Sequence, residues 1–298
     1  MTTTNDLTAI IVCFNSAHII GNALKLLADA KVTTIVVDNG SGDNSVEIAR
    51  HFGAQIIENH QNLGFGIANN IGVRAAKTQW ILMLNPDIEI GENAIQDLLA
   101  ATKIYQNIGI LAPKIIEPDG RVFIQPRSLL SPQFLNHAKN FTPIGDCCVP
   151  FLSGACYLVN RAIFLELGGF DENIFLFYED DDLCRRYWDA GRSLIHIENA
   201  TALHARGKSS QPLKGRVFTV RYHMAWSRNY VCRKYRIAPK PYADLAKNGI
   251  KYLLAALSLN RQRMERYGGS FMGNWDAIFA SKPKQCAIAQ FTPPMNGG

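Results

Sequence analysis

The chain has 298 residues, of which 47% are hydrophobic and 19% are charged, so it is predicted to be globular rather than disordered. Its formal net charge of +6 suits an anionic partner such as a nucleotide, a diphosphate lipid or an acidic membrane face, although basic proteins without such partners are common. No apolar run approaches the ~20 residues that span a bilayer, and the N-terminus lacks a signal-peptide pattern. These features predict a cytoplasmic protein, either soluble or peripheral at the inner face of the cell membrane.

The seven cysteines form no C-x-x-C pair, and their number is odd. Several stand in apolar runs, where a free cysteine acts as a small buried hydrophobe. This pattern argues against a structural zinc site and against a disulfide framework, and it predicts reduced thiols.

Short apolar, β-branched runs alternate with helical patterns in the first part of the chain. Strands are expected at 8–14, 33–37, 54–58 and 80–84, and helices at 45–52, 67–76, 92–105 and from the cap candidates Asn15-Ser16 to about residue 30. This alternation predicts parallel strands joined by right-handed crossovers. Ligands bind at the carboxyl ends of such strands, so Asp38 and Asn85-Pro86-Asp87, which follow two of them, are expected to converge on one crevice.

The rhythm changes after residue 105. Strands are expected at 109–116, 151–160 and 193–197, helices at 161–167 and 180–190, and a long loop at 125–150. From about residue 215 the pattern is helical and basic, with an apolar stripe at Ile250, Leu253, Leu254 and Leu257. A stripe of this kind most often packs on the main domain of a protein. The alternative is that it contacts a membrane surface. The predicted boundaries are 1–214 for an α/β domain, 215–280 for a helical extension and 281–298 for a disordered tail.

Two acidic motifs could carry chemistry. Asp87 follows a buried strand and a rigid proline, as suits a ligand of Mg²⁺ or Mn²⁺, although Asn-Pro-Asp is also a common turn. Glu179 to Asp182 are four consecutive carboxylates, whose repulsion a cation or burial with a raised pKa would relieve, and a carboxyl with a raised pKa can act as a general base. The alternative for this run is a solvated helix start, where the helix dipole favours acids.

Three further motifs are weaker. His204 could be a metal ligand, although a single histidine is more often structural. Gly207-Lys208-Ser209 lacks the upstream glycine of a phosphate-binding loop, where Ala202 stands instead. Gly64-x-Gly66 lacks the third glycine of a dinucleotide fingerprint and follows the third strand rather than the first, which disfavours a nicotinamide enzyme.

Together and in this order, the motifs resemble glycosyltransferase family 2 with the GT-A fold, an α/β fold with a Rossmann-like mixed sheet flanked by helices. The resemblance covers about residues 7–210 and is closest to the rhamnosyltransferase-like branch of bacterial surface polysaccharide synthesis. The matching stretches are IIVCFNSAHIIGNALKLL, IVVDNGSGDNSVEIA, NHQNLGFGIANNIGVRAA, WILMLNPDIEI, FLSGACYLVNRAIFLELGGFDENIFLFYEDDDLCRRYWDAG and ALHARGKSS.

The resemblance implies a role for each matching residue. Asp87 would bind the divalent cation, Mg²⁺ or Mn²⁺, with His204 as a further ligand, and Asn85 replaces the first aspartate of the family's D-x-D motif. Asp180 would be the catalytic base, assisted by Glu179. The donor nucleotide would lie against Phe14, Asn15, Asp38, Asn62, Gly64, Asn69 and Asn85, and the acceptor against Ser153, Gly154 and Ala155.

The implied reaction is inverting transfer of a sugar, rhamnose in this branch, from a dTDP- or UDP-linked donor to a saccharide or polyprenyl-diphosphate-linked acceptor. No nucleic acid partner is expected, and a homodimer and a membrane contact stay open. The alternatives are transfer of another hexose, such as glucose, galactose or N-acetylglucosamine, and a non-catalytic sugar-nucleotide or glycan-binding protein. A nucleotidyltransferase is disfavoured because Asn15-Ser16-Ala17-His18 replaces a glycine-rich phosphate loop.

Overall fold

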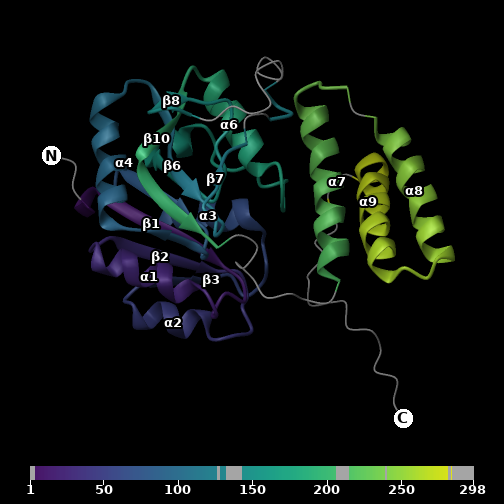
Figure 1. Ribbon diagram of the computed structural model, residues 1–298, viewed down its shortest axis with the longest axis horizontal. Helices are drawn as coiled ribbons and strands as arrows, with labels where there is room; N and C mark the ends of the chain where they lie inside the picture. Colours follow the sequence, from purple (N-terminus) through teal and green to yellow (C-terminus); the bar gives the residue numbers. More distant parts are fainter. Residues whose placement is uncertain are drawn as a thin grey trace, which may run out of the picture. The chain divides into compact units, whose positions relative to one another are not determined.

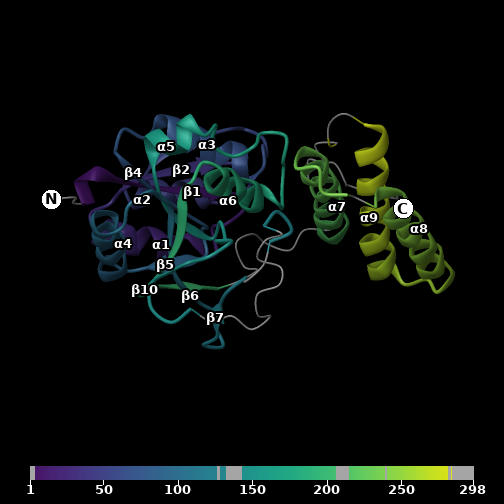
Figure 2. The ribbon, with the colours of Figure 1, turned by 90° about the horizontal axis from the view of Figure 1, so that it is seen from above.

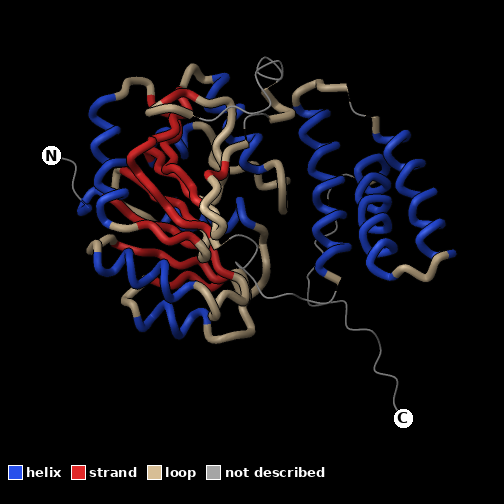
Figure 3. Tube along the Cα trace, viewed as in Figure 1, coloured by secondary structure: helices blue, strands red, loops and turns tan. Residues whose placement is uncertain are grey.

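The computed structural model describes residues 4–125, 128–131, 143–205, 215–238, 240–280 and 283. The chain forms two compact units. Met1–Asp171 and Asp180–Gln211 form an α/β unit, and Glu172–Glu179 and Pro212–Gly298 form a helical unit (Figures 1 and 3). The segment Glu172–Glu179 therefore belongs with the C-terminal helices, although in the chain it stands between the two parts of the α/β unit. The predicted tail, 281–298, apart from residue 283, and half of the predicted loop at 125–150 lie outside the described residues.

A mixed sheet forms the centre of the α/β unit, and its strand order is β3-β2-β1-β4-β9-β6-β10-β5, with β7 paired to β6 and β8 to β10. The strands are β1 (Leu7–Cys13), β2 (Thr33–Asp38), β3 (Gln55–Glu58), β4 (Trp80–Leu84), β5 (Ile88–Ile90), β6 (Ile108–Ile116), β7 (Val122–Phe123), β8 (Cys147–Cys148), β9 (Cys156–Asn160) and β10 (Ser193–His204). The four strands β3, β2, β1 and β4 are parallel, as predicted. β9 is antiparallel to both β4 and β6, so the whole sheet is mixed.

Alternate side chains of each central strand enter two cores, one on each face of the sheet. Ala9 and Ile11 of β1 pack in the core that contains α1 (Ile20–Asp29), α2 (Ser45–His51) and α4 (Glu92–Ile104). Ile10 packs in the other core, with α3 (Phe65–Ala75), α5 (Arg161–Glu166) and α6 (Glu179–Asp189). Helices therefore cover both faces (Figure 2), which is why the strands are continuous apolar runs in the sequence.

The parallel register brings the carboxyl ends of three strands to one edge of the sheet. Cys13, the last residue of β1, pairs with Asp38, the last residue of β2, and Leu84 at the end of β4 pairs with Ile11. Asp38 and the segment after Leu84 therefore start from the same edge, as the strand pattern predicted.

Two elements differ from the prediction in ways that matter for the site. β10 continues to His204 instead of ending at residue 197, because an irregularity between Ile197 and Thr201 lets it keep pairing with β6 past the polar residues Glu198 and Asn199. β5 was not predicted, because three residues are too few to show a period. β5 pairs antiparallel with the end of β10, with Ile88 opposite His204.

The first helix also starts later than predicted. α1 begins at Ile20, and neither Asn15 nor Ser16 caps it with its side chain. Asn15 instead has φ 52°, in the left-handed region, and its side-chain oxygen accepts a hydrogen bond from the Gly42 amide at 2.8 Å. The prediction of a cap at this position is wrong, because the side chain holds the loop after β2 instead.

The helical unit contains α7 (Arg216–Lys234), α8 (Pro241–Leu257) and α9 (Arg261–Phe279), and α9 lies between the other two (Figures 1 and 2). α7 and α9 approach closely because α9 has glycine at the contact: a Cβ on Gly269 or Gly273 would overlap the backbone of α7. Tyr222 of α7 donates a hydrogen bond to Asp276 of α9 at 2.8 Å. None of the described helices is long and apolar enough to cross a membrane.

Candidate active site

Asp87, the predicted metal ligand, lies between β4 and β5 and is 2% exposed. His204 reaches it from the end of β10, with Nε2 3.5 Å from Asp87 Oδ1. The two residues meet because β5 pairs with β10, and the Asp87 carbonyl also accepts a hydrogen bond from the Ala205 amide at 3.1 Å. The structure therefore brings together two residues that are 117 positions apart, as 204 − 87 gives.

This pair fits a divalent cation. No described residue hydrogen-bonds either carboxylate oxygen of Asp87, or Nδ1 of His204, although all three atoms are buried. Burying a carboxylate without partners is costly, and a cation would compensate that cost. Nowhere in the described ranges do three or more His, Cys, Asp or Glu side chains form a metal cluster, so a cation at this pair would take two side-chain ligands. Mg²⁺ and Mn²⁺ bind in this way when substrate phosphates and water complete the shell.

The second carboxylate, Asp180, lies in the first turn of α6 and is held by one hydrogen bond. The Gly154 amide donates to Oδ2 at 2.8 Å. The other oxygen, Oδ1, is buried, and no residue of the described ranges hydrogen-bonds it. The pKa of Asp180 is raised to about 7, chiefly by burial, with the Gly154 hydrogen bond lowering it and the charge of Asp181 raising it. Asp180 thus gains or loses a proton near neutral pH, as a general base requires.

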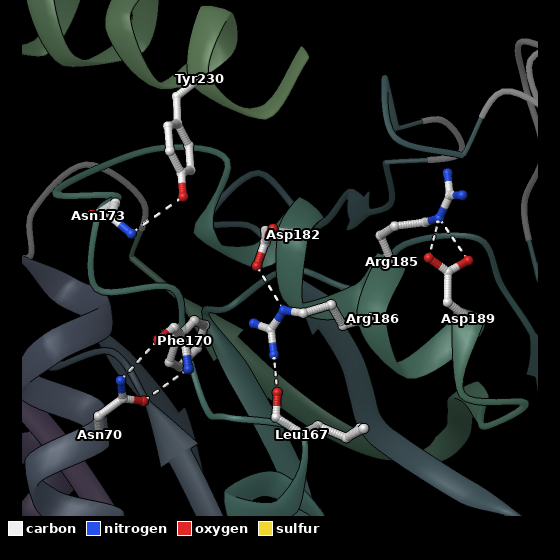
Figure 4. Close-up of polar contacts among 9 residues, drawn as sticks. All are labelled: Asn70, Leu167, Phe170, Asn173, Asp182, Arg185, Arg186, Asp189 and Tyr230. Carbon is white, nitrogen blue, oxygen red and sulfur yellow. Dashed lines mark hydrogen bonds and ion pairs between the residues drawn. The ribbon is translucent and has the colours of Figure 1, made fainter. Parts of the chain in front are cut away.

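The next two acids of the run are stabilised differently. Ser128 donates a short hydrogen bond to Asp181. Asp182 is fully buried and pairs with Arg186 at 2.8 Å, and Arg186 also donates to the Leu167 carbonyl at 2.7 Å (Figure 4). Asp182 is fully buried, so the alternative of a solvated helix start is wrong for it, and Asp180 is partly buried with its Oδ1 enclosed. Asp182 thus has a cationic partner, and among the described residues no ion pair is found for Asp180, which agrees with its predicted role as the base.

The segment Ser153-Gly154-Ala155 connects the two carboxylates. Its Gly154 amide hydrogen-bonds Asp180, and its Ala155 carbonyl accepts from the Asn85 amide at 2.9 Å. Asn85 is two residues before Asp87 in the chain. One backbone-to-side-chain and one backbone-to-backbone hydrogen bond therefore link Asp180 to the segment that carries Asp87.

Gly154 leaves no room for a side chain, because a Cβ there would overlap the Asp180 carboxylate. We expect Gly154→Ala to displace Asp180 and to lower kcat/KM about tenfold to a hundredfold, because general-base catalysis depends on position. Steady-state kinetics would measure this loss. The matched control is Gly91→Ala, since a Cβ at Gly91 meets nothing within 4 Å. Equal kinetics for the two variants would contradict the role of Gly154.

The predicted nucleotide side is built from a tightly held loop after β2. Asp38 is 4% exposed, and its carboxylate accepts hydrogen bonds from the Gly40 and Ser41 amides, both at 3.0 Å, and from the Cys13 thiol at 3.3 Å. The carboxylate therefore fixes the turn in addition to the predicted contact with a base. The Asn15 amide donates to Ser41 Oγ at 2.9 Å and completes the connection between the two strand ends.

Asparagine side chains hold the loop between β3 and α3 against this turn. Asn39 donates to the Gly64 carbonyl at 3.1 Å and accepts from Asn59 at 2.8 Å. Asn62 accepts from the Gly64 amide at 3.0 Å. Asn69 is buried and donates to the Phe65 carbonyl at 3.0 Å, within α3. Sequence reasoning missed Asn39, although its place in a turn cluster directly after a buried strand could have identified it.

Asn70 was also missed, and it connects α3 to the segment after α5. Its side chain donates to the Phe170 carbonyl at 2.9 Å and accepts from the Phe170 amide at 2.8 Å (Figure 4). Gly169, with φ 66°, keeps the space beside the Asn70 side chain. Sequence patterns carry no signal for this contact, because the two residues are 100 positions apart.

The segment before α6 has unusual backbone geometry and is held by α7. Phe177 and Tyr178 have φ of 66° and 68°, a region that bulky residues rarely adopt. Within the helical unit, Ser227 donates to the Leu176 carbonyl at 3.0 Å, and Asn173 donates to the Tyr230 hydroxyl at 3.2 Å (Figure 4). The sequence identified this aromatic run only as an apolar wall. The structure shows that α7 hydrogen-bonds this segment within the helical unit.

Solved structures define the class of this fold. A mannosyltransferase from Pyrobaculum calidifontis in complex with GDP-Man and Mn²⁺ matches 93% of this chain and 88% of its own, with a TM-score of 0.58 and 15% identity. GalNAc-T7 with UDP, GalNAc and Mn²⁺ matches 93% of this chain and 58% of its own, with a TM-score of 0.53 and 15% identity. The α/β unit therefore has the GT-A glycosyltransferase fold, as the sequence predicted.

Sequence comparisons place the chain within that class. The glycosyl transferase family 2 profile matches residues 8–168, and the chain belongs to this family. An N-acetylglucosaminyl-diphospho-decaprenol L-rhamnosyltransferase of Mycobacterium tuberculosis is 29% identical over 218 residues, covering 63% of this chain and 71% of its own. Rhamnosyltransferase WbbL of Escherichia coli is 26% identical over 227 residues, covering 69% and 84%. The protein is a glycosyltransferase with rhamnosyltransferase relatives, which confirms the predicted class.

Proposed function

We propose that the protein transfers a sugar, with inversion, from a nucleotide-diphosphate donor to a saccharide on a polyprenyl diphosphate, and that it requires a divalent cation. The observation that carries this proposal is the connected pair of carboxylates. Asp180 is partly buried, with its Oδ1 fully enclosed and a pKa raised to about 7, and backbone groups of the segment Ser153-Gly154-Ala155 hydrogen-bond both its carboxylate and the Asn85 amide, two residues before Asp87. In such a pair, one carboxylate accepts the proton of the acceptor hydroxyl and the other acts, through the cation, on the leaving diphosphate.

Asp180 acts on the acceptor side in this proposal. The Gly154 hydrogen bond occupies Oδ2, so Oδ1 is the oxygen that accepts the proton of the acceptor hydroxyl. The hydroxyl oxygen then forms its bond to the anomeric carbon as the bond to the diphosphate breaks, so one displacement inverts that carbon. A retaining enzyme with a covalent intermediate would need a carboxylate nucleophile at the donor carbon, and the proposed role of Asp180 requires none.

Asp87 and His204, whose Oδ1 and Nε2 lie 3.5 Å apart, would hold the cation on the leaving-group side. When bound, a divalent cation neutralises the charge that develops on a departing diphosphate. The protein's own residues orient that site, because the pairing of β5 with β10 fixes Asp87 beside His204 before any ligand binds.

The relatives favour a deoxyhexose donor and a lipid-linked acceptor. Two of them are rhamnosyltransferases, and the mycobacterial one acts on an N-acetylglucosaminyl-diphospho-decaprenol. Hexosyltransferase Agl10 of Haloferax volcanii, 28% identical over 219 residues, keeps transfer of another hexose as the second candidate. We propose dTDP-rhamnose as the first donor to test and UDP-hexoses as the next, with the enzyme acting in the cytoplasm on envelope polysaccharide.

A thermal-shift screen with nucleotide diphosphates and their sugars, each with Mn²⁺, tests this proposal. A true donor is expected to raise Tm, by an amount that grows with ligand concentration. Transfer of the same sugar to a polyprenyl-diphosphate saccharide should then be detectable by mass spectrometry. A protein that only binds sugar nucleotides would show the shift without turnover, and the absence of both would contradict the proposal.

A further inference from the structure

Four apolar side chains form a row on the outer side of α8. Ile250, Leu253, Leu254 and Leu257 are 60%, 62%, 61% and 83% exposed, and Leu259 in the following turn is 87% exposed. Their spacing of three and four residues places the four on one face of the helix. Most soluble proteins expose large apolar residues singly, so a continuous row marks an interaction surface. We call these five residues the α8 stripe.

The rest of the helical unit explains why the α8 stripe is uncovered. α9 lies between α7 and α8, so among the described helices α8 packs mainly on α9 and reaches α7 through the Arg228–Asp244 ion pair (Figures 1 and 2). The side of α8 that meets α9 has small residues, and Ala255 is its one buried residue. A Cβ on Gly249 would lie 3.2 Å from the ring of Phe271 in α9. α8 therefore uses its small residues for helix packing and turns its leucines outward.

The charges around the α8 stripe have one dominant sign. From Pro241 to Arg266 the chain has five basic residues and two acidic ones, Asp244 and Glu265. Both acids already have cationic partners, Asp244 with Arg228 at 2.9 Å and Glu265 with Arg261 at 3.7 Å. Lys247, Arg263 and Arg266 are exposed. These exposed basic residues of α8 and the start of α9, which we call the cationic border, accompany the apolar row, and such a combination binds an anionic lipid surface.

An apolar hollow adjoins the stripe. Leu253 of the stripe lines it together with Phe218 of α7, Tyr252 of α8 and Phe271 and Met272 of α9, and its volume is about 370 Å³. Gly249 and Gly268 keep it open, because their missing side chains leave the space next to the aromatic rings. A hydrocarbon chain suits such a hollow, since its lining is almost entirely apolar.

We infer that the α8 stripe is a docking surface for an anionic membrane, with the leucines entering the acyl boundary and the surrounding lysine and arginine side chains contacting lipid phosphates. This inference goes beyond the proposed transfer and needs no substrate. It identifies a surface by which the protein would be held where a lipid-linked acceptor is found.

Vesicle co-sedimentation of the full-length protein tests the inference. The wild type is expected to sediment with vesicles of phosphatidylcholine and phosphatidylglycerol in equal parts, and weakly with phosphatidylcholine alone, because the cationic border needs anionic lipid. Leu253→Ser/Leu254→Ser/Leu257→Ser should weaken binding about tenfold or more, because it removes the apolar anchor. Lys247→Gln/Lys251→Gln/Arg263→Gln should weaken it and remove its salt dependence.

The matched control is Ile104→Ser, which removes an equally exposed apolar side chain, 69% exposed, from α4 of the other unit. It should bind vesicles as the wild type does. Wild type that fails to sediment with anionic vesicles, or a triple serine variant that sediments normally, would overturn the inference. So would a dimer that the serine variant abolishes without any vesicle binding, because the stripe would then cover a second copy. Donor-induced thermal shifts measured on the same variants separate these results from a failure of the proposed transfer.

Discussion

Asp180→Asn is expected to lower kcat by about a hundredfold to ten-thousandfold while leaving the affinity for the donor nucleotide nearly unchanged, because the amide cannot accept the acceptor proton. The substitution keeps the side-chain oxygen that accepts from the Gly154 amide, so the local structure should survive. Steady-state kinetics combined with nucleotide titration would measure both quantities. Near-normal turnover in this variant would refute the assignment of Asp180 as the base.

The pH dependence provides a second readout of the same prediction. Because burial raises the pKa of Asp180 to about 7, the active carboxylate form is lost as pH falls, and kcat/KM should fall about tenfold per pH unit below 7. Asp181→Asn is the matched control, one residue along α6. It should retain turnover and move this limb to lower pH, because the charge of Asp181 raises the pKa of Asp180.

The contribution of Asp180 to the stability of the fold should depend on pH in the opposite direction from kcat/KM. The folded-state pKa of Asp180 is above its unfolded value of 3.8, so the folded protein prefers the neutral form. The contribution of Asp180 to the free energy of unfolding is therefore largest below pH 4 and is lost as pH rises through 7. In the absence of ligands, Asp180→Asn should match the wild type near pH 4 and exceed it by a few kcal/mol at most above pH 7. Urea unfolding at the two pH values would measure this difference.

Asp87→Ala is expected to abolish metal-dependent transfer, with kcat/KM lowered about a thousandfold, because Asp87 supplies the only carboxylate of the proposed metal pair. In the wild type, EDTA should stop the reaction and Mg²⁺ or Mn²⁺ should restore it. Calorimetric titration of Mn²⁺ in the presence of a nucleoside diphosphate provides a readout that does not depend on turnover. The variant should lose the Mn²⁺ heat.

A neighbouring carboxylate supplies the control for this prediction. Glu89→Gln changes an acid two positions along the chain, whose side chain accepts a hydrogen bond from Asn22 at 2.8 Å. This variant should bind Mn²⁺ and turn over as the wild type does. The metal-free Asp87→Ala protein should also have an unchanged or higher Tm, because it lacks a buried carboxylate with no hydrogen-bond partner among the described residues. Full activity of the wild type in a metal-free assay would contradict the role of Asp87.

Much of the fold could be read from local patterns. The runs at 33–37 and 80–84 are continuously apolar, and they became β2 and β4, which are buried between helices on both faces. Gly191, with φ 69°, ends α6 where predicted. These signals are reliable because each depends on residues that are near one another in the chain. The prediction that Asp38 and Asn85-Pro86-Asp87 share an edge also held, since parallel strands end at the same edge.

The sequence by itself determined the α/β class, the family and the residues most suited to bind metal or accept a proton, because these depend on local periodicity and on the order of several motifs. The roles of the individual residues stay predictions. Only the tertiary structure decided how these residues meet. The short strand β5 and the extended end of β10 bring His204 to Asp87, Gly154 holds Asp180, and burial raises the pKa of that carboxyl. Pairing between distant strands and the loss of water around a buried group are properties of the packed chain, so no local pattern records them.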